Sequence, residues 1–252
     1  MNPLVVIPSR LAATRLPGKP LADIHGEPMI VHVWRRAMEA TIGPVVVACG
    51  DAEIAEAIER AGGTAMLTDP NHPSGSDRIH EAVSRLDPER RYDVIVNVQG
   101  DLPTIEPDIV RASLAPFADP TVDITTLACV IRAEEERHDP NVPKVVAAFA
   151  PDAKPGASVR ALYFSRATVP AGPGEHYFHI GLYAYRRAAL ERYVALPPGV
   201  LEQRERLEQL RALEAGMHIE VVLVDTVPLG VDTPAHLALA REMLAPAAEN
   251  PN

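Results

Sequence analysis

The chain has 252 residues, 47% of them hydrophobic, which is enough apolar material for the core of one large α/β unit. Its formal net charge of −10 at pH 7 argues against nucleic acid or an anionic membrane surface as the main partner. No apolar run approaches the ~18 residues that cross a bilayer, and the start of the chain lacks the features of a secretory signal. The two cysteines form no disulfide or metal pattern. We therefore expect a cytoplasmic protein without a membrane partner.

Short apolar runs alternate with helical patterns through the first half of the chain. Strands are expected at Leu4–Ile7, Val45–Ala48, Ala65–Leu67 and Asp93–Val98, with helices at Met29–Ala40, Glu53–Arg60 and Asp77–Leu86. Strands separated by helices of about ten residues favour a parallel sheet with right-handed crossovers.

The second half changes character. Strands are expected at Ile124–Ile131, Lys144–Phe149, Val159–Phe164, Tyr177–Tyr185 and Ile219–Val224, with helices at Glu106–Ala115, Arg187–Val194, Leu201–Ala215 and Thr233–Leu244. Because few helices separate these strands, we expect mixed or antiparallel pairing. The pattern as a whole predicts an α/β fold with a mostly parallel central sheet and mixed strands in its C-terminal half. We expect a single domain over residues 1–246 and a frayed tail over 247–252.

The loop after the first strand concentrates positive charge in an acidic protein. Arg10, Arg15 and Lys19 lie within ten residues, at the carboxyl end of a strand, where open α/β sheets bind ligands. Such cations, with exposed backbone N–H groups, suit a triphosphate. The loop matches neither GxGxxG nor GxxxxGK[ST], which argues against a dehydrogenase or a P-loop enzyme. The alternative is a solvated turn whose arginines pair with surface carboxylates.

Two aspartates follow predicted strands. Asp101 comes directly after Gly100, which lets backbone or ligand approach closely, and Asp232 precedes the last helix. Carboxylates beside a phosphate-binding loop suit Mg²⁺, and two of them could hold ions that bridge the reacting phosphates. The alternative is that each aspartate only caps the turn or helix that follows it.

Further motifs are spread over essentially the whole chain. They comprise Lys19–Leu21, Gly26–Val33, Ser74–Arg78, Asn97–Asp101, Asp139–Asn141, Ala161–Pro170, His179–Tyr183, Leu207–Arg211 and Gly230–Pro234. Together they resemble the 3-deoxy-manno-octulosonate cytidylyltransferase family, also called CMP-Kdo synthetases. The resemblance is specific, because the segments on the sugar side are absent from nucleotidyltransferases in general.

The resemblance implies a Rossmann-like nucleotidyltransferase fold, a homodimer, and Mg²⁺ as the cofactor. The implied substrates are CTP and the acidic sugar Kdo (3-deoxy-D-manno-octulosonate). The implied reaction yields CMP-Kdo and pyrophosphate, a step toward lipopolysaccharide.

The motif match also implies roles for individual residues. The catalytic residues would be Lys19, Asp101 and Asp232, of which Asp101 and Asp232 would bind the metal. The nucleotide would be bound by Arg10, Arg15, Lys19, Ser74, Arg78 and Gln99. The sugar would be bound by Arg166, His179, Tyr183, Glu208 and Gln209. Without the resemblance, the same sugar-side residues predict a core histidine, a surface arginine and a glutamate that pairs along its helix.

Three positions depart from the family pattern: Leu102, Phe178 and Pro143. They leave the preferred sugar open, so a cytidylyltransferase for amino-Kdo or sialic acid is the alternative. Sialic acid enzymes, however, lack the Lys-Pro-Leu continuation and the LEQLR segment. A catalytically silent nucleotide sensor is expected to lose Lys19 or an aspartate, and this chain keeps them.

Overall fold

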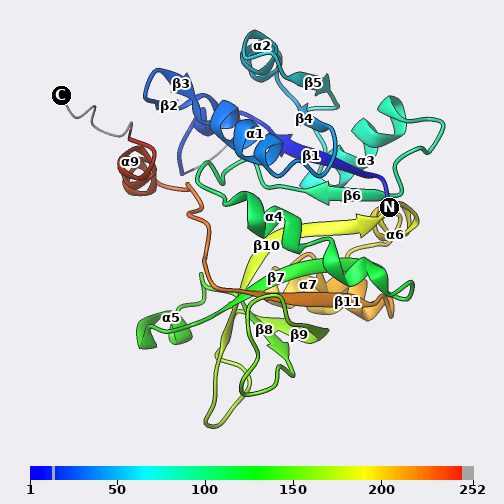
Figure 1. The fold of residues 1–252 in the computed structure, drawn as a ribbon, viewed down its shortest axis with the longest axis vertical. Coiled ribbons are helices and arrows are strands. Elements are labelled where there is room, and N and C mark those ends of the chain that lie inside the picture. The colour runs from blue at the N-terminus through cyan, green and yellow to red at the C-terminus, as the bar shows by residue number, and fades with distance from the viewer. Residues whose placement is uncertain (13–14, 246–252) are drawn as a thin grey trace.

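The first half of the chain forms the expected alternation of strands and helices. The computed structural model describes residues 1–12 and 15–245, so the tail predicted to fray lies outside the described residues. Four strands lie side by side in the order β5 (Thr64–Leu67), β4 (Val45–Cys49), β1 (Pro3–Ser9) and β6 (Val94–Asn97) (Figure 1). All of their pairings are parallel, as predicted.

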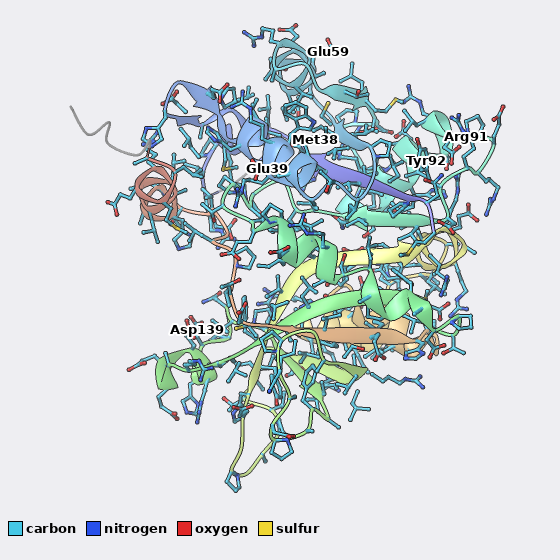
Figure 2. All side chains as sticks on the ribbon, in the orientation of Figure 1. Met38, Glu39, Glu59, Arg91, Tyr92 and Asp139 are labelled. Carbon is cyan, nitrogen blue, oxygen red and sulfur yellow. The ribbon has the colours of Figure 1, made fainter. Side chains whose placement is uncertain are left out.

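Helices cover both faces of these strands. The helices α1 (Met29–Glu39), α2 (Ala52–Arg60) and α4 (Pro107–Ala112) contribute to one core, and α3 (Gly75–Leu86) and α6 (Arg187–Val194) to the other. Side chains alternate along a strand, so Val5 and Ile7 enter the first core whereas Leu4 and Val6 enter the second. On the outer side of α2, Glu59 projects into solvent (Figure 2).

The second half extends the same sheet. It adds, in spatial order, β10 (Tyr177–Arg186), β7 (Ile124–Val130), β11 (Ile219–Val224), β9 (Ser158–Ser165) and β8 (Lys144–Ala147). Here β10 runs antiparallel to β6 and β7, whereas β11 is parallel to β7. Because β8 pairs with both β9 and β10, this end of the sheet curls back on itself. The sheet as a whole is therefore mixed. Its first four strands are parallel, and its C-terminal half contains the mixed strands that the sequence predicts.

The helix predicted at Leu201–Ala215 is two short helices, α7 (Val200–Glu205) and α8 (Leu210–Glu214). Between them Arg206 adopts a left-handed conformation, with φ 55°. The carbonyl groups of Glu205 and Arg206 accept hydrogen bonds from the Arg166 side chain, an interaction that leucine spacing along the helix cannot reveal. Five short elements were also not predicted: η1 (Lys19–Leu21), β2 (Asp23–Ile24), β3 (Glu27–Pro28), η2 (Ala115–Ala118) and α5 (Glu134–His138).

The C-terminal helix α9 (Pro234–Met243) lies against the N-terminal β2–β3 hairpin (Figure 1). Leu237 packs with Ile24 and Met29 in a small separate core, and the Arg241 side chain donates to the carbonyl oxygen of Asp23. The contact between α9 and this hairpin places the segment that precedes α9 next to the loop after β1. Within the described residues, no helix is both long and apolar enough to cross a membrane.

Candidate active site

Lys19 lies between two aspartates from distant parts of the chain. Its Nζ atom donates to Oδ2 of Asp101 at 2.9 Å and to Oδ1 of Asp232 at 3.0 Å. Arg15 reaches the same cluster, because its Nη2 atom donates to Oδ2 of Asp232 at 3.0 Å. The structure thus brings into direct contact the three residues predicted to be catalytic, whereas their catalytic role stays a prediction.

The backbone fixes this cluster at the carboxyl ends of β1 and β6. Gly100 follows β6 where a Cβ would lie 2.7 Å from the carbonyl oxygen of Pro8, so a larger residue would push the two loops apart. The Val231 N–H donates to the carbonyl oxygen of Asp101 at 2.9 Å. This hydrogen bond holds the segment that carries Asp232 beside Asp101.

The capping alternative for the two aspartates finds no support in the hydrogen bonds. The N-cap of α9 is Thr233, whose side chain accepts from the His236 N–H. The N-cap of α4, the next helix after Asp101, is Glu106. Asp101 and Asp232 instead direct their carboxylates at a cation.

The charges in this cluster reinforce one another. Burial alone would lower the pKa of Lys19, but the charges and hydrogen bonds of Asp101 and Asp232 outweigh it and raise this pKa above its ordinary value. Burial alone would raise the pKa of Asp232, yet Lys19 and Arg15 bring it below its ordinary value. The ammonium and the Asp232 carboxylate therefore both stay charged at neutral pH.

The donor set of this cluster fits a hard divalent cation. Both carboxylates already share one positive group, the Lys19 ammonium, within hydrogen-bonding distance. Within residues 1–12 and 15–245, no group of three or more His, Cys, Asp or Glu side chains is arranged to hold a metal by itself. Mg²⁺ commonly binds through one or two carboxylates together with substrate phosphates, so two aspartates suffice when a phosphate supplies further oxygens.

Four residues predicted to bind the nucleotide line one cavity of about 120 Å³ beside this cluster. They are Arg10, Ser74, Arg78 and Gln99. The Arg78 side chain donates to Thr68 Oγ1 at 2.6 Å, and no carboxylate among the described residues forms an ion pair with it. Burial, together with the nearby charge of Arg10, lowers the pKa of Arg78. Arg10 and Arg78 face one cavity, and neither forms an ion pair with a carboxylate within residues 1–12 and 15–245, which favours an anionic ligand there.

Ser74 has a structural task as well as a place in the cavity wall. It is the N-cap of α3, where its Oγ atom accepts from the Asp77 N–H and donates to Oδ2 of Asp77 at 2.6 Å. These two hydrogen bonds close the first turn of α3. The next residue, Gly75, leaves room for Pro8, whose Cγ atom would lie 3.3 Å from an added Cβ.

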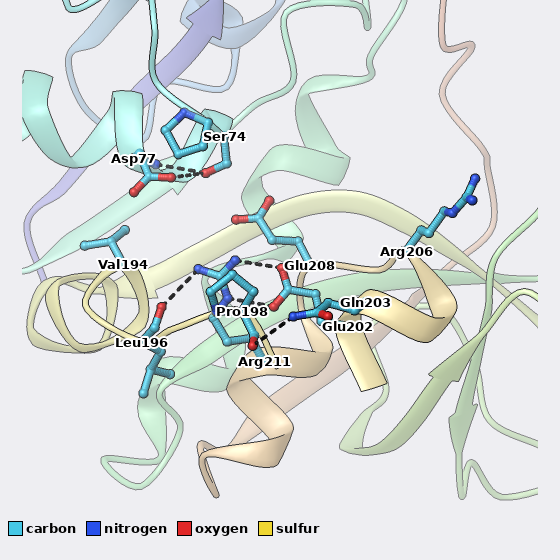
Figure 3. Close-up of a pocket in the computed structure, with 11 residues that line it drawn as sticks. Ser74, Asp77, Val194, Leu196, Pro198, Glu202, Gln203, Arg206, Glu208 and Arg211 are labelled. Carbon is cyan, nitrogen blue, oxygen red and sulfur yellow. Dashed lines mark hydrogen bonds and ion pairs between the residues drawn. The ribbon is translucent and has the colours of Figure 1, made fainter. Parts of the chain in front are cut away.

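Two further cavities continue from the first. One of about 80 Å³ is lined by Gln99, Tyr183 and Glu208 among others, and a larger one of about 550 Å³ by Ser74 and Glu208 among others (Figure 3). Because neighbouring cavities share Gln99, Ser74 or Glu208, they form one depression that leads from the phosphate loop to α8. Six residues predicted on the nucleotide or sugar side thus border common space: Arg10, Ser74, Arg78, Gln99, Tyr183 and Glu208.

Glu208 is the most unusual group in this depression. Its Oε1 atom is buried and accepts no hydrogen bond from the described residues. Burial raises the pKa of Glu208 above its ordinary value. An unpaired buried acceptor that lines two cavities is suited to take a hydrogen bond from a ligand hydroxyl group.

His179 and Gln209 meet in the interior behind these cavities. His179 is 4% exposed and Gln209 6% exposed, and Gln209 Nε2 lies 3.3 Å from His179 Nδ1. Burial lowers the pKa of His179 to about 3, so this imidazole is neutral. The Phe164 and Tyr183 rings pack beside it at 4.8 and 5.6 Å between centroids. His179 is thus a hydrogen-bonded core histidine that contacts two further predicted sugar-side residues.

Arg166 is placed differently from the other predicted sugar-side residues. Its guanidinium donates to three backbone carbonyl groups, those of Pro140, Glu205 and Arg206. It lines none of the three cavities described above. Through these hydrogen bonds, Arg166 links the segment between α7 and α8 to the turn at Asp139–Asn141. A contact of Arg166 with the sugar stays a prediction.

Sequence reasoning missed several residues that line the depression. They are His72, Asn97, Tyr185 and Tyr193. Asn97 ends β6 and is the first residue of the Asn97–Asp101 motif, but the motif match assigned it no role. Tyr193 lies in α6, outside every motif, and only the fold brings it to Glu208, whose carbonyl oxygen accepts from the Tyr193 hydroxyl at 3.0 Å.

Comparison with known proteins gives a consistent result. A family model described as cytidylyltransferase matches residues 4–219. A 3-deoxy-manno-octulosonate cytidylyltransferase of Paramagnetospirillum magneticum is 65% identical over 244 residues, which cover 97% of this chain and 98% of the relative. Another, from Rhodospirillum centenum, is 66% identical over 245 residues, covering 97% of this chain and 94% of the relative.

Solved structures agree with these sequence matches. A CMP:2-keto-3-deoxy-manno-octonic acid synthetase complexed with CTP superposes with a TM-score of 0.87 at 38% identity, covering 97% of this chain and 99% of that one. A cytidylyltransferase from Leptospira borgpetersenii, at 14% identity, has a TM-score of 0.58 over 92% of this chain and 82% of its own, a likeness of fold alone.

Proposed function

The chain belongs to the cytidylyltransferase family, among the 3-deoxy-manno-octulosonate cytidylyltransferases, and we propose from this that it transfers the cytidylyl group of CTP to Kdo. The products are CMP-Kdo and pyrophosphate, and CMP-Kdo serves lipopolysaccharide synthesis. The observation that carries the proposal is the contact of Lys19 with Asp101 and Asp232 beside the cavity that holds Arg10 and Arg78.

The reaction poses an electrostatic problem. The anomeric hydroxyl of Kdo lies next to a carboxylate, and its attack on the α-phosphorus brings one anion toward another. Positioning and neutralisation of charge should therefore supply most of the catalysis. Arg10 and Arg78 provide fixed positive charge in the cavity of an otherwise acidic protein, whereas Lys19 and Arg15 balance the charges of Asp101 and Asp232.

Asp101 and Asp232 would hold Mg²⁺. When bound, this ion would withdraw charge from the phosphate and lower the pKa of the attacking hydroxyl. The remaining tasks belong to side chains of this protein. Arg10, Arg15 and Lys19 bind the triphosphate and stabilise the pyrophosphate that leaves.

The sugar occupies the depression near α8. Glu208 accepts from a sugar hydroxyl, because its buried Oε1 atom lies in the cavity wall and accepts no hydrogen bond from the described residues. Tyr183 lines the same cavity, with Gln209 behind it beside His179, and Gln99 separates the sugar from the nucleotide. No described residue is assigned as a general base.

Three further properties follow from family membership as parts of the proposal. The parallel strands β5-β4-β1-β6 with helices on both faces support a Rossmann-like description. The protein works as a homodimer, for which Leu162, 60% exposed on β9, offers apolar contact surface. It acts in the cytoplasm, where CTP is available.

The proposal is tested by pyrophosphate release with CTP and a panel of sugar acids, with and without EDTA. We expect Kdo to give the highest kcat/KM and EDTA to abolish the reaction. A higher kcat/KM for amino-Kdo or sialic acid would replace Kdo as the substrate, and no release with any sugar acid would refute the function.

A further inference from the structure

The hydroxyl group of Thr126 lies at the centre of a buried network behind the sugar side. Thr126 is fully buried in β7, and its Oγ1 atom lies 2.9 Å from His179 Nε2. The same atom lies 3.1 Å from the carbonyl oxygen of Ile180 and 2.9 Å from that of Leu182. One hydroxyl group thus faces a ring nitrogen and two carbonyl groups of β10.

The number of protons in this network limits which atoms donate and which accept. A threonine hydroxyl has one proton to donate and two lone pairs. The carbonyl oxygens of Ile180 and Leu182 can only accept, and Thr126 Oγ1 lies within donating distance of both. When the Thr126 proton goes to one of them, His179 Nε2 carries the ring proton and donates it to Thr126 Oγ1. The neutral ring keeps its lone pair on Nδ1, the atom that faces Gln209.

The amide of Gln209 follows from the state of the ring. With a lone pair on His179 Nδ1, Gln209 must turn its NH₂ group toward the ring, in agreement with the Nε2–Nδ1 distance of 3.3 Å. Its Oε1 atom, for which no hydrogen bond is found among the described residues, is then the acceptor that Gln209 turns away from the ring. The opposite tautomer would turn this amide around and present two donors in its place.

Thr126 also holds an irregularity of β10. The pairing of β10 with β7 is regular up to Ile180, shifts, and resumes at Tyr183, where Thr126 is the partner. The carbonyl groups that flank the unpaired Gly181 are those in contact with Thr126 Oγ1. The carbonyl of Gly181 accepts from Gln99 Nε2 at 3.0 Å, so this irregularity also orients Gln99.

We propose that Thr126 is a positioning residue, which fixes the tautomer of His179 and thereby makes Gln209 an acceptor for a sugar hydroxyl. The inference rests on the proposed function for the identity of the sugar. Thr126 itself touches neither substrate. It acts through the ring of His179 and through the irregular segment of β10.

The test combines ¹⁵N NMR of histidine-labelled protein with steady-state kinetics. The wild-type His179 signal, assigned by its loss in His179→Gln, should show the proton on Nε2. In Thr126→Val, the His179 signal should no longer show the proton fixed on Nε2. The KM for Kdo should rise about fivefold, the effect of one buried hydrogen bond, while the KM for CTP stays within twofold. Thr126→Ser, which keeps the hydroxyl, should restore both.

A matched control is Thr125→Val. Thr125 is the adjacent buried threonine, but its hydroxyl donates to the carbonyl oxygen of Ser113 instead. The Thr125→Val variant should have a lower free energy of unfolding, with no change in the His179 signal or in the KM for Kdo.

A wild-type ring protonated on Nδ1 would overturn the proposal without any variant. An unchanged KM for Kdo in Thr126→Val, or equal losses for Kdo and CTP, would overturn it as well. Failure of the proposed function is recognised separately, because the wild-type protein would then not turn over Kdo. The NMR measurement would still show which nitrogen of His179 carries the proton.

Discussion

Removal of the Arg166 side chain tests how the sugar side of the site is held together. In Arg166→Ala the guanidinium no longer bonds the carbonyl groups of Pro140 and Glu205, each at 2.9 Å, or that of Arg206 at 3.3 Å. The backbone N–H of residue 166 keeps its hydrogen bond to Oε2 of Glu205. The substitution therefore loosens the break between α7 and α8 without removing the contact between β9 and α7.

The magnitude follows from these three hydrogen bonds. A hydrogen bond to a charged group contributes roughly 1.5–3 kcal/mol, but the freed carbonyl groups lie near the surface and regain water. We expect a net loss of about 2 kcal/mol in the free energy of unfolding, not three full bonds. For a chain of this size, such a loss lowers Tm by roughly 4–8 °C.

The kinetic effect should fall on one substrate. Glu208 and Gln209 follow the break directly, so the KM for Kdo should rise about tenfold, whereas the KM for CTP should stay within twofold. Thermal melting together with kinetics in which each substrate is varied measures both quantities. Arg160→Ala is the control, because Arg160 is exposed on the same strand and makes no hydrogen bond with its side chain among the described residues.

Two results would refute this reasoning. An unchanged Tm and an unchanged KM for Kdo would show that the three hydrogen bonds do not hold the site. A raised KM for Kdo at an unchanged Tm would instead assign Arg166 to direct binding of the sugar, as the family resemblance implies.

The remaining predictions concern the charged clusters. Asp101→Asn and Asp232→Asn should each lower kcat about 10²–10³-fold with an unchanged circular dichroism spectrum, and near-wild-type turnover at saturating Mg²⁺ would contradict the role of that residue. Lys19→Arg should also lower kcat, because a forked guanidinium does not replace one nitrogen 2.9 and 3.0 Å from the two carboxylates, and a fully active variant would refute this. Burial alone would raise the pKa of Asp87, but two backbone N–H groups and the Arg187 side chain hold it at about 2, below its unfolded value of 3.8. Its contribution of roughly 2 kcal/mol should be present above about pH 4 and vanish as the pH falls to about 2, so urea melts should show a gap between wild type and Asp87→Asn that closes in acid.

The contact among Lys19, Asp101 and Asp232 could be anticipated from the sequence. Lys19 and Asp101 follow β1 and β6, and the carboxyl ends of neighbouring parallel strands meet at one edge of a sheet. The sequence also indicates Asp232 as a second candidate metal ligand, but not how it reaches Asp101. Its position depends on the docking of α9 against β2 and β3, two short strands that no periodicity indicates.

The sugar side was less predictable, because it depends on irregular backbone. The break at Arg206 arises from hydrogen bonds to Arg166, which is distant in sequence. The irregularity at Gly181 arises where β10 and β7 shift register around the hydroxyl of Thr126. Alternation along a strand indicates which side chains share a face, but it does not locate such a shift.

The fate of a label in CTP tests the central claim most directly. The protein is incubated with Mg²⁺, Kdo and CTP that carries ³²P at the α-phosphate, and the products are separated. Cytidylyl transfer predicts that all converted label appears in CMP-Kdo while the pyrophosphate is unlabelled. Label in pyrophosphate or in free CMP without a sugar product, or equal transfer to sialic acid, would contradict the account.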